Sequence, residues 1–409
     1  MSVNSTVLPI GDKQRYLILD LLRGFALLGI CMANFPEFSL YTFLDSSATG
    51  SMPTAGIDYF VNYFLCIFVD GKFYTIFSLL FGIGFSIIIS NVAERGGNGL
   101  AVFYRRMFYL LIIGFIHLMF VWSGDILMLY AIVGMFLPLF IKSSDKVILI
   151  TAAIFLFLPV LVDFTCQWTG IYLSKAIVEW QGIYCDRYGI TSENFAYWLR
   201  DAQSYDDVFK FLIQGAIVRL QEFVDGNRYF KVLGLFLIGF YIGRNRLYAK
   251  FQDYFSILKK ILLSGLFIGF PLSWLYAFSC MEGRPWGIGV HSLLYFTSVY
   301  LTSFGYIAAI CLLFLKYKDL SLWKALSFPG RMALTNYIGQ SVAGMIIFYG
   351  IGLGLGADMG LVFVELIVMC VYSCEVLFSA LWLKFFRFGP LEWIWRCLTY
   401  NKLFSLYKT

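Results

Sequence analysis

The chain has 409 residues, of which 60% are hydrophobic and only 14% charged, and its formal net charge is +6 at pH 7. Soluble domains carry roughly 25% charged residues, and a soluble chain of this size cannot hide so much apolar surface. The composition therefore excludes soluble enzymes, nucleic-acid-binding proteins and disordered regulators. Its continuous apolar runs of about 20 residues match helices that cross a bilayer, whereas a transmembrane β-barrel shows alternating segments of about 10 residues. The sequence predicts an all-α polytopic membrane protein.

The apolar runs predict about ten transmembrane helices within a single domain of residues 1–409. A polar stretch, Met1 to Gln14, precedes the first run, and no small-residue cleavage site follows that run, so we interpret it as a retained helix. The predicted spans are Tyr16 to Asn34, Phe73 to Ser90, Met107 to Trp122, Ile126 to Ile141, Val147 to Thr169, Tyr229 to Gly243, Ile261 to Cys280, His291 to Leu315, Met332 to Leu353 and Gly360 to Leu383.

The distribution of basic residues between the loops predicts the orientation in the membrane. With both termini in the cytoplasm, 21 of the 31 Lys and Arg residues fall on inner segments, nine fall on outer segments, and only Arg23 lies deep within a span. Cytoplasmic loops carry an excess of Lys and Arg, so this split favours cytoplasmic N and C termini.

Three of the segments outside the predicted spans have features of their own. Asp58 to Asp70 is apolar but too short to cross, so we expect an interfacial or re-entrant helix on the outer side. Gly170 to Arg228 is long and polar, and it is interpreted as an outer cap of short helices. Residues 386–409 include Pro390 and Glu392, a favourable helix start, and predict a short helix on the cytoplasmic interface.

Arg23 is the first candidate for a functional residue, because it lies about two turns into the first span. A charge at that depth costs about 2.5–3.5 kcal/mol on insertion scales, so it needs a partner or a water-filled cavity. One reading is contact with an anionic or polar ligand. The other is an ion pair with Asp20 on the same helix face, and the two readings are compatible.

A second candidate lies on the inner side, where Pro329 and Gly330 precede a predicted helix whose first turn carries Arg331. Free backbone N–H groups, the positive end of the helix dipole and an arginine together form an anion site. This pattern favours a phosphate-bearing cofactor, although an arginine anchored at the headgroup level also fits. Asn336 adds a polar group on the path into the bundle.

The chain has two histidines. His117 lies near the outer end of its predicted helix, and Asp125 follows in a short turn, where it can orient the imidazole for proton abstraction. The alternative is a core histidine beside a helix-capping aspartate. His291 opens its span at the outer surface and is interpreted as an interfacial residue without a role.

Acidic residues inside the last span keep a transport function open. Glu365 and Glu375 are ten residues apart and point in different directions, so they form no carboxylate pair. Glu375 lies near mid-bilayer, and a proton-coupled transporter would use such a residue. The nine cysteines form no CxxC pair or Cys/His cluster, so no metal site is predicted.

Several long motifs resemble those of one bacterial family. The segments LDLLRGFALLGICMANF, GKFYTIFSLLFGIGF, GRMALTNYIGQS and FGPLEWIWRCLTY resemble the bacterial YeiB-like membrane proteins, which are classified under a domain of unknown function numbered 418. The resemblance covers nearly the whole chain in order. It implies a location in the bacterial cytoplasmic (inner) membrane.

The YeiB-like proteins are in turn distantly similar to ten-helix membrane acyltransferases, which share an Arg-Gly pair in the first helix, here Arg23-Gly24. The resemblance implies transfer of an acyl group from cytoplasmic acyl-CoA to a small-molecule, glycan or lipid acceptor across the membrane. The family-three O-acyltransferases carry an essential histidine where this sequence has Asn34. Either His117 or another group replaces that histidine, or the chemistry has been lost. Our first hypothesis is that Arg23, Arg331 and Asn336 hold the donor and that His117, with Asp125 and Asn34, acts as general base.

Two other functions stay open. One is a transporter of a small organic or lipid-derived anion, with Arg23 and Glu375 lining the path. The other is a membrane binding protein without turnover. The partners expected in every case are the lipid bilayer and no nucleic acid, and the sequence leaves a homo-oligomer open.

Overall fold

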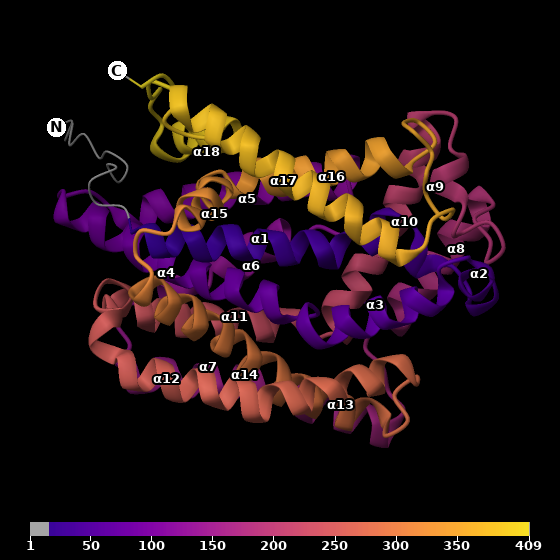
Figure 1. The fold of residues 1–409 in the computed structure, drawn as a ribbon, viewed down its shortest axis with the longest axis horizontal. Coiled ribbons are helices and arrows are strands. Elements are labelled where there is room, and N and C mark those ends of the chain that lie inside the picture. Colours follow the sequence, from indigo (N-terminus) through magenta and orange to yellow (C-terminus); the bar gives the residue numbers. More distant parts are fainter. Residues whose placement is uncertain (1–15, 409) are drawn as a thin grey trace.

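The computed structural model describes residues 16–408, and most of these residues are helical. The long helices run side by side along the long axis of the molecule (Figure 1). By length and composition, seven helical segments of residues 16–408 suffice to cross a membrane: Leu17–Phe38, Ala55–Glu94, Gly99–Phe120, Asp145–Thr169, Phe251–Met281, Gly287–Lys316 and Leu361–Phe385. Two shorter apolar helices, Leu127–Phe140 and Ala333–Phe348, accompany them. The prediction of a helical polytopic membrane protein is confirmed.

The helices follow one another in a single bundle. They are α1 (Leu17–Phe38), α2 (Ser46–Ser51), α3 (Ala55–Phe68), α4 (Lys72–Glu94), α5 (Gly99–Phe120), α6 (Leu127–Gly134), α7 (Asp145–Thr169), α8 (Lys175–Tyr188), α9 (Trp198–Asp201), α10 (Tyr205–Asp225), α11 (Arg228–Arg244), α12 (Phe255–Ser264), α13 (Phe270–Met281), α14 (Gly287–Lys316), α15 (Ser321–Arg331), α16 (Ala333–Phe348), α17 (Leu361–Phe385) and α18 (Pro390–Tyr400).

Each of the ten apolar runs lies mainly on helix in the structure, but two of them are interrupted, and the run Met332 to Leu353 extends five residues beyond the end of α16 at Phe348. The run at Ile126 to Ile141 is α6 followed by a 3-10 turn at Leu137–Phe140, which contains Pro138. The run at Ile261 to Cys280 passes through a π-turn at Gly265–Gly269 between α12 and α13, just before Pro271. Proline has no backbone N–H, so the helical hydrogen-bond ladder changes locally near it.

The segment Asp58 to Asp70 forms most of α3, which leads directly into α4. The break between them lies at Gly71, whose φ of +72° lies in the left-handed region. Lys72 is fully buried and donates from Nζ to the Cys66 carbonyl oxygen at 2.8 Å, so its cation caps the carbonyl end of α3. At the other end of α3, the buried Asp58 carboxylate accepts from Val362 N at 2.9 Å. α3 is thus joined to both α4 and α17.

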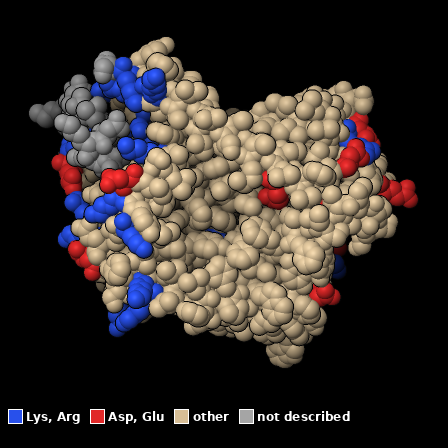
Figure 2. Space-filling view, viewed as in Figure 1, with Lys and Arg blue, Asp and Glu red and all other residues tan. Residues whose placement is uncertain are grey.

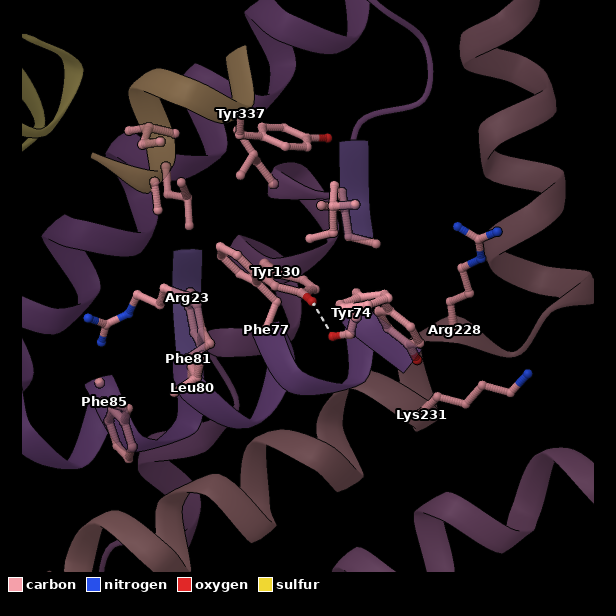
Figure 3. A pocket seen from close by; sticks show the side chains of 18 of the residues that line it. Arg23, Tyr74, Phe77, Leu80, Phe81, Phe85, Tyr130, Arg228, Lys231 and Tyr337 are labelled. Atoms are coloured by element: carbon pink, nitrogen blue, oxygen red, sulfur yellow. Dashed lines mark hydrogen bonds between the residues drawn. The ribbon is translucent and has the colours of Figure 1, made fainter. Parts of the chain in front are cut away.

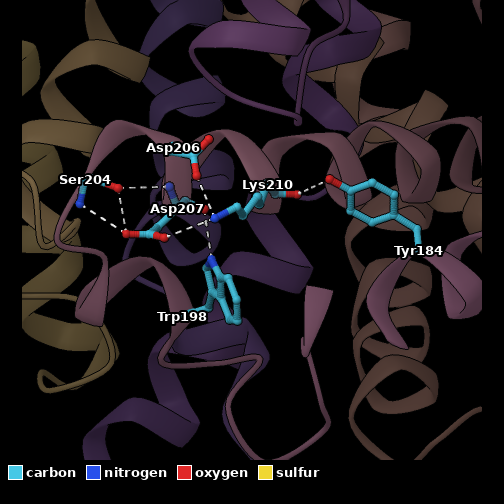
Figure 4. Close-up of polar contacts among 6 residues, drawn as sticks. All are labelled: Tyr184, Trp198, Ser204, Asp206, Asp207 and Lys210. Carbon is cyan, nitrogen blue, oxygen red and sulfur yellow. Dashed lines mark hydrogen bonds and ion pairs between the residues drawn. The ribbon is translucent and has the colours of Figure 1, made fainter. Parts of the chain in front are cut away.

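Residues 170–228 contain α8, α9 and α10, which gather at the end of the molecule opposite to the C terminus (Figure 1). Side-chain hydrogen bonds hold this cap together (Figure 4). Trp198 Nε1 donates to the Asp207 carbonyl oxygen at 2.9 Å, and the Tyr184 hydroxyl donates to the Lys210 carbonyl oxygen at 3.2 Å. Ser204 and Asp207 form a capping box at the start of α10, and the hydrogen bond from Ser204 lowers the pKa of Asp207 below its ordinary value.

Charge is distributed unevenly between the two ends. On the face shown in Figure 2, Lys and Arg gather at the end that holds α18, and Asp and Glu are the more prominent charges towards the end that holds the cap. We call these the basic end and the cap end. The surface between them is almost free of charge on that face, as expected for side chains that face lipid.

Candidate functional site

A cavity of about 1090 Å³ lies inside the bundle. α1 lines it from Asp20, near the basic end, to Glu37, near the cap end. At 1.5 Å per helical residue these positions are roughly 25 Å apart, so the cavity follows most of the depth of a bilayer. It has two charged ends and a middle of mainly aromatic and aliphatic side chains.

The basic end of the cavity, called here the basic chamber, is rich in guanidinium groups. Asp20 forms an ion pair with Arg23 at 2.8 Å, and Glu94 forms one with Arg246 at 2.8 Å. The Arg106 guanidinium lies 3.5 Å from the centre of the Trp395 ring, a cation–π geometry. Arginine binds phosphate through two parallel hydrogen bonds, so this chamber suits a phosphate-bearing ligand. Its arginines are Arg23, Arg106, Arg246, Arg331 and Arg396.

A close helix crossing brings two of these arginines together. Gly24 of α1 faces the Leu326 carbonyl of α15, and Gly330 of α15 faces the backbone of Asp20 and Gly24. A Cβ atom at either glycine would meet backbone atoms, so only glycine permits this approach. Because Arg23 and Arg331 are the chain neighbours of these glycines, the crossing places both side chains on the same chamber.

The predicted anion site at the helix start beside Arg331 is wrong in one respect. Arg331 ends α15, and the next helix, α16, is capped by a carboxylate from α18. Glu392 accepts from Leu334 N at 2.7 Å, from Thr335 N at 3.0 Å and from the Thr335 hydroxyl at 2.6 Å. Burial raises the pKa of Glu392, and the hydrogen bonds from Thr335 partly offset that shift. The N–H groups are therefore occupied, and only the arginine part of the prediction applies to a ligand.

Asn336 does not line the cavity. Its amide is buried and donates to Ser379 Oγ at 2.9 Å and to the Pro329 carbonyl oxygen at 3.3 Å. These bonds fasten α16 to α17 and to the end of α15. The prediction that Asn336 lies on a path into the bundle is therefore wrong.

The middle of the cavity has few polar groups and many aromatic side chains (Figure 3). Phe77 and Phe81 of α4, Tyr130 of α6 and Tyr337 of α16 line it. The Tyr130 hydroxyl is within 2.6 Å of Ser78 Oγ and donates to the Tyr74 carbonyl oxygen at 3.3 Å, so its polar group is satisfied within the wall. This section suits an extended, weakly polar chain.

The cap end of the cavity, called here the cap chamber, mixes charges of both signs. Arg219 is buried, donates from Nε to the Ser123 carbonyl oxygen at 3.0 Å and forms ion pairs with Glu222 and, at 3.6 Å, with Glu37. Sequence reasoning missed Arg219, although an arginine within the apolar face of an amphipathic helix signals an internal partner. The polar lining here includes Asn34, Glu37, Asp70, Asp163, Arg219, Glu222, Asp225, Arg228, Lys231, Arg284 and His291.

His117 is beside Asp125, but it stands behind the cavity wall. Its Nδ1 lies 2.9 Å from Asp125 Oδ1, and its Nε2 lies 2.9 Å from Ser341 Oγ. The side chain is 1% exposed, and neither His117 nor its two partners line the cavity. The rings of Trp122 and Tyr337 pack against the imidazole. The Ser–His–Asp chain joins α5, α6 and α16, and its position disagrees with direct proton abstraction from a ligand in the cavity.

Asn34 and His291 both line the cap chamber. The sequence predicts an interfacial His291 without a role, yet the residue lines the chamber, with Nδ1 3.0 Å from Ser279 Oγ. Glu375, by contrast, does not line the cavity; its Oε2 accepts from Gln340 Nε2 at 2.9 Å. Within residues 16–408, no group of three or more His, Cys, Asp or Glu side chains is placed to hold a metal ion.

The fold and cavity define the class of protein: an α-helical membrane bundle with a charged internal cavity. Residues 242–402 match the family model described as protein of unknown function (DUF418). The chain is 29% identical to the uncharacterized protein YxaH of Bacillus subtilis (strain 168) over 97% of each chain. It is 27% identical to the uncharacterized protein YeiB of Escherichia coli (strain K12), over 94% of this chain and 96% of that protein.

A third relative, an uncharacterized 39.9 kDa protein in the amylase 3' region of Bacillus acidopullulyticus, is 29% identical over 97% of each chain. No solved structure matches the chain. The predicted resemblance to YeiB-like membrane proteins and to the DUF418 family is confirmed.

Proposed function

We propose that the protein is a membrane acyltransferase that takes an acyl group from a CoA-type donor in the basic chamber and passes it to an acceptor in the cap chamber. The observation that carries this proposal is the single cavity of about 1090 Å³, which joins five arginines at one end to a polar chamber at the other. The resemblance to ten-helix acyltransferases supports the same reading.

The side chains of the basic chamber fit the donor by charge and shape. Arg23, Arg331 and Arg396 supply guanidinium groups for phosphates, and Trp395 holds Arg106 in place. The aromatic middle of the cavity accepts the long, weakly polar arm of the donor and excludes water from the thioester. In this proposal an acceptor hydroxyl attacks the thioester carbonyl, its C–O bond forms as the C–S bond breaks, and the proton ends on the released thiol.

The structure changes the roles that we assign at the cap chamber. Asn34 contacts the acceptor, since it lines the cavity. His291 is the histidine in the lining, and we assign the proton-accepting step to it. His117 and Asp125 act as positioning residues, because they hold α5, α6 and α16 behind the wall residue Tyr337.

Coenzyme A is expected to raise the melting temperature of the purified full-length protein in detergent. Arg331→Ala should weaken coenzyme A binding about tenfold or more, since a hydrogen bond between charged groups is worth about 1.5–3 kcal/mol. Arg331→Lys should restore binding only in part, because an ammonium lacks the planar fork. Lys402→Gln removes an exposed charge that lies outside the cavity lining and is the matched control. Equal stabilisation of the wild type and Arg331→Ala, or none, would contradict the donor site.

A second candidate function is transport of an amphipathic anion. The length of the cavity along α1 favours transport, because the basic chamber and the cap chamber belong to one cavity through which an anion could pass. Reconstituted liposomes separate the two functions: a transporter moves its anion between compartments without a thioester, whereas the acyltransferase releases free thiol only when donor and acceptor are both present.

We further propose the bacterial inner membrane as location, with ten spans, cytoplasmic termini and the cap of residues 170–228 outside. The basic residues at the end that holds α18 support this orientation (Figure 2). Glu179 and Ser405 are exposed at opposite ends. In intact cells an impermeant thiol reagent should label Glu179→Cys and not Ser405→Cys, with the unsubstituted chain as control for its own cysteines. Labelling of Ser405→Cys alone would reverse the orientation.

A further inference from the structure

The carboxylates of the cap chamber are engaged by donors from the protein. Asp163 accepts from Asn227 Nδ2 at 3.2 Å and from the Ser292 hydroxyl. Asp70 accepts from the Tyr276 hydroxyl at 2.5 Å. Glu222 binds Arg219. These carboxylate oxygens therefore help to hold the helices together.

Three cations of the cap chamber, Arg228, Lys231 and Arg284, have few ion pairs with the protein. Among the described residues, Lys231 has no carboxylate within ion-pair distance, and its ammonium lies 4.2 Å from the centre of the Tyr295 ring. Arg228 has only a long ion pair, 3.7 Å to Glu222. Arg284 is exposed at the chamber and forms no ion pair within residues 16–408. Figure 3 shows Arg228 and Lys231 on the same side of Tyr74.

Arg228 and Lys231 also lie together at the start of a helix. Both lie in the first turn of α11, three residues apart and on one face, and that turn holds no acidic residue. The positive end of a helix dipole repels cations and attracts anions. Two cations at a helix start are thus stabilised by an anion that binds between them.

A neighbouring hydroxyl points to the same ligand. The Tyr74 hydroxyl oxygen is buried and makes no hydrogen bond of good geometry with the described residues, and Tyr74 lines the cavity beside Arg228 and Lys231. A buried hydroxyl without a partner costs about 1–3 kcal/mol. A ligand oxygen that accepts from Tyr74 would remove that cost.

We infer that the cap chamber binds a phosphate-bearing group through Arg228, Lys231 and Tyr74, with Arg284 at its exposed side. Phosphate has enough acceptor oxygens to engage a guanidinium fork, an ammonium and a hydroxyl together. This inference rests on the proposed function, since it makes the acceptor a phosphate-bearing molecule. That molecule is either a lipid with an anionic headgroup or a soluble phosphate ester.

The test uses the full-length protein without coenzyme A, so that it is independent of the basic chamber. Binding of glycerol phosphate is measured in detergent by the shift in melting temperature, and retention of phosphatidylglycerol against phosphatidylcholine is measured by native mass spectrometry. Lys231→Gln and Arg228→Gln should each weaken binding about tenfold or more. The matched control is Lys175→Gln, an exposed cation of the cap outside the cavity lining.

A preference for phosphatidylglycerol that is lost in Lys231→Gln identifies the lipid as source, and stabilisation by glycerol phosphate identifies the soluble ester. Arg284→Gln, a change on the exposed surface, gives a folded variant with weaker binding if Lys231→Gln does not fold. Equal binding to wild type and these variants, or no binding of either probe, would overturn the inference. In that case stabilisation by coenzyme A still decides the proposed function separately.

Discussion

Gly330→Ala is expected to destabilise the protein by about 3 kcal/mol, at the upper end of the usual cost of overpacking. A methyl group at Gly330 would meet the Asp20 carbonyl and the Gly24 amide of α1, and backbone atoms cannot turn aside as side chains do. The helices α1 and α15 would separate, and Arg23 and Arg331 would lose their shared chamber. Thermal unfolding in detergent measures the loss, and coenzyme A binding should fall with it.

Gly84→Ala is the matched control for this prediction. Gly84 lies within α4 and lines the cavity, but a Cβ atom there meets no atom within 4 Å. Alanine has a higher helix propensity than glycine by about 1 kcal/mol, so this variant should be as stable as the wild type or slightly more stable. A Gly330→Ala protein that melts like Gly84→Ala would show that the crossing tolerates a side chain.

His117→Ala is expected to lower the free energy of unfolding by about 3 kcal/mol. The substitution removes one of two hydrogen-bond partners from the buried Asp125 carboxylate and from the buried Ser341 hydroxyl, and it opens a hole among packed rings. A catalytic base would behave differently, since its removal abolishes turnover while the fold and the donor site persist. Melting temperature and yield of folded protein are the measurements.

His291→Gln provides the comparison, because His291 is the other histidine of the chain. It lies only partly buried in the cap chamber, and it has one hydrogen bond, to Ser279. We expect a small change in stability and a large loss of acyl transfer. The reverse pattern, a stable but inactive His117→Ala and an active His291→Gln, would return the catalytic role to His117.

The long apolar helices could be predicted because each depends on local composition. A run of apolar residues such as Leu361–Phe385 has the length of a bilayer wherever it stands in the chain. α3 was harder, since its 14 residues are too few to cross and the charged Asp70 and Lys72 follow. The position of α3 depends on the buried Lys72 ammonium, which donates to a carbonyl oxygen at the end of α3. Composition alone does not show such a contact.

Whether a contact of the candidate site could be predicted depends on how far apart its two partners lie in the sequence. His117 and Asp125 are eight residues apart, and a short turn brings them together, so their pairing could be predicted. Ser341 completes the same hydrogen-bond chain from 224 residues away. The carboxylate that caps α16 likewise comes from Glu392, more than fifty residues later. One sequence without structure cannot show which distant polar group reaches a helix end.

The C-terminal tail has a practical consequence for any work on the purified protein. After α18 the chain turns back on the end of α17, where Arg387 N donates to the Leu406 carbonyl oxygen at 2.9 Å and Lys408 N donates to the Phe385 carbonyl oxygen at 3.0 Å. The tail therefore acts as a latch that holds α18, and with it Trp395 and Glu392, against the cavity. An affinity tag or a truncation at this terminus is expected to disturb the basic chamber, so a tag placed there belongs among the variables of a binding experiment.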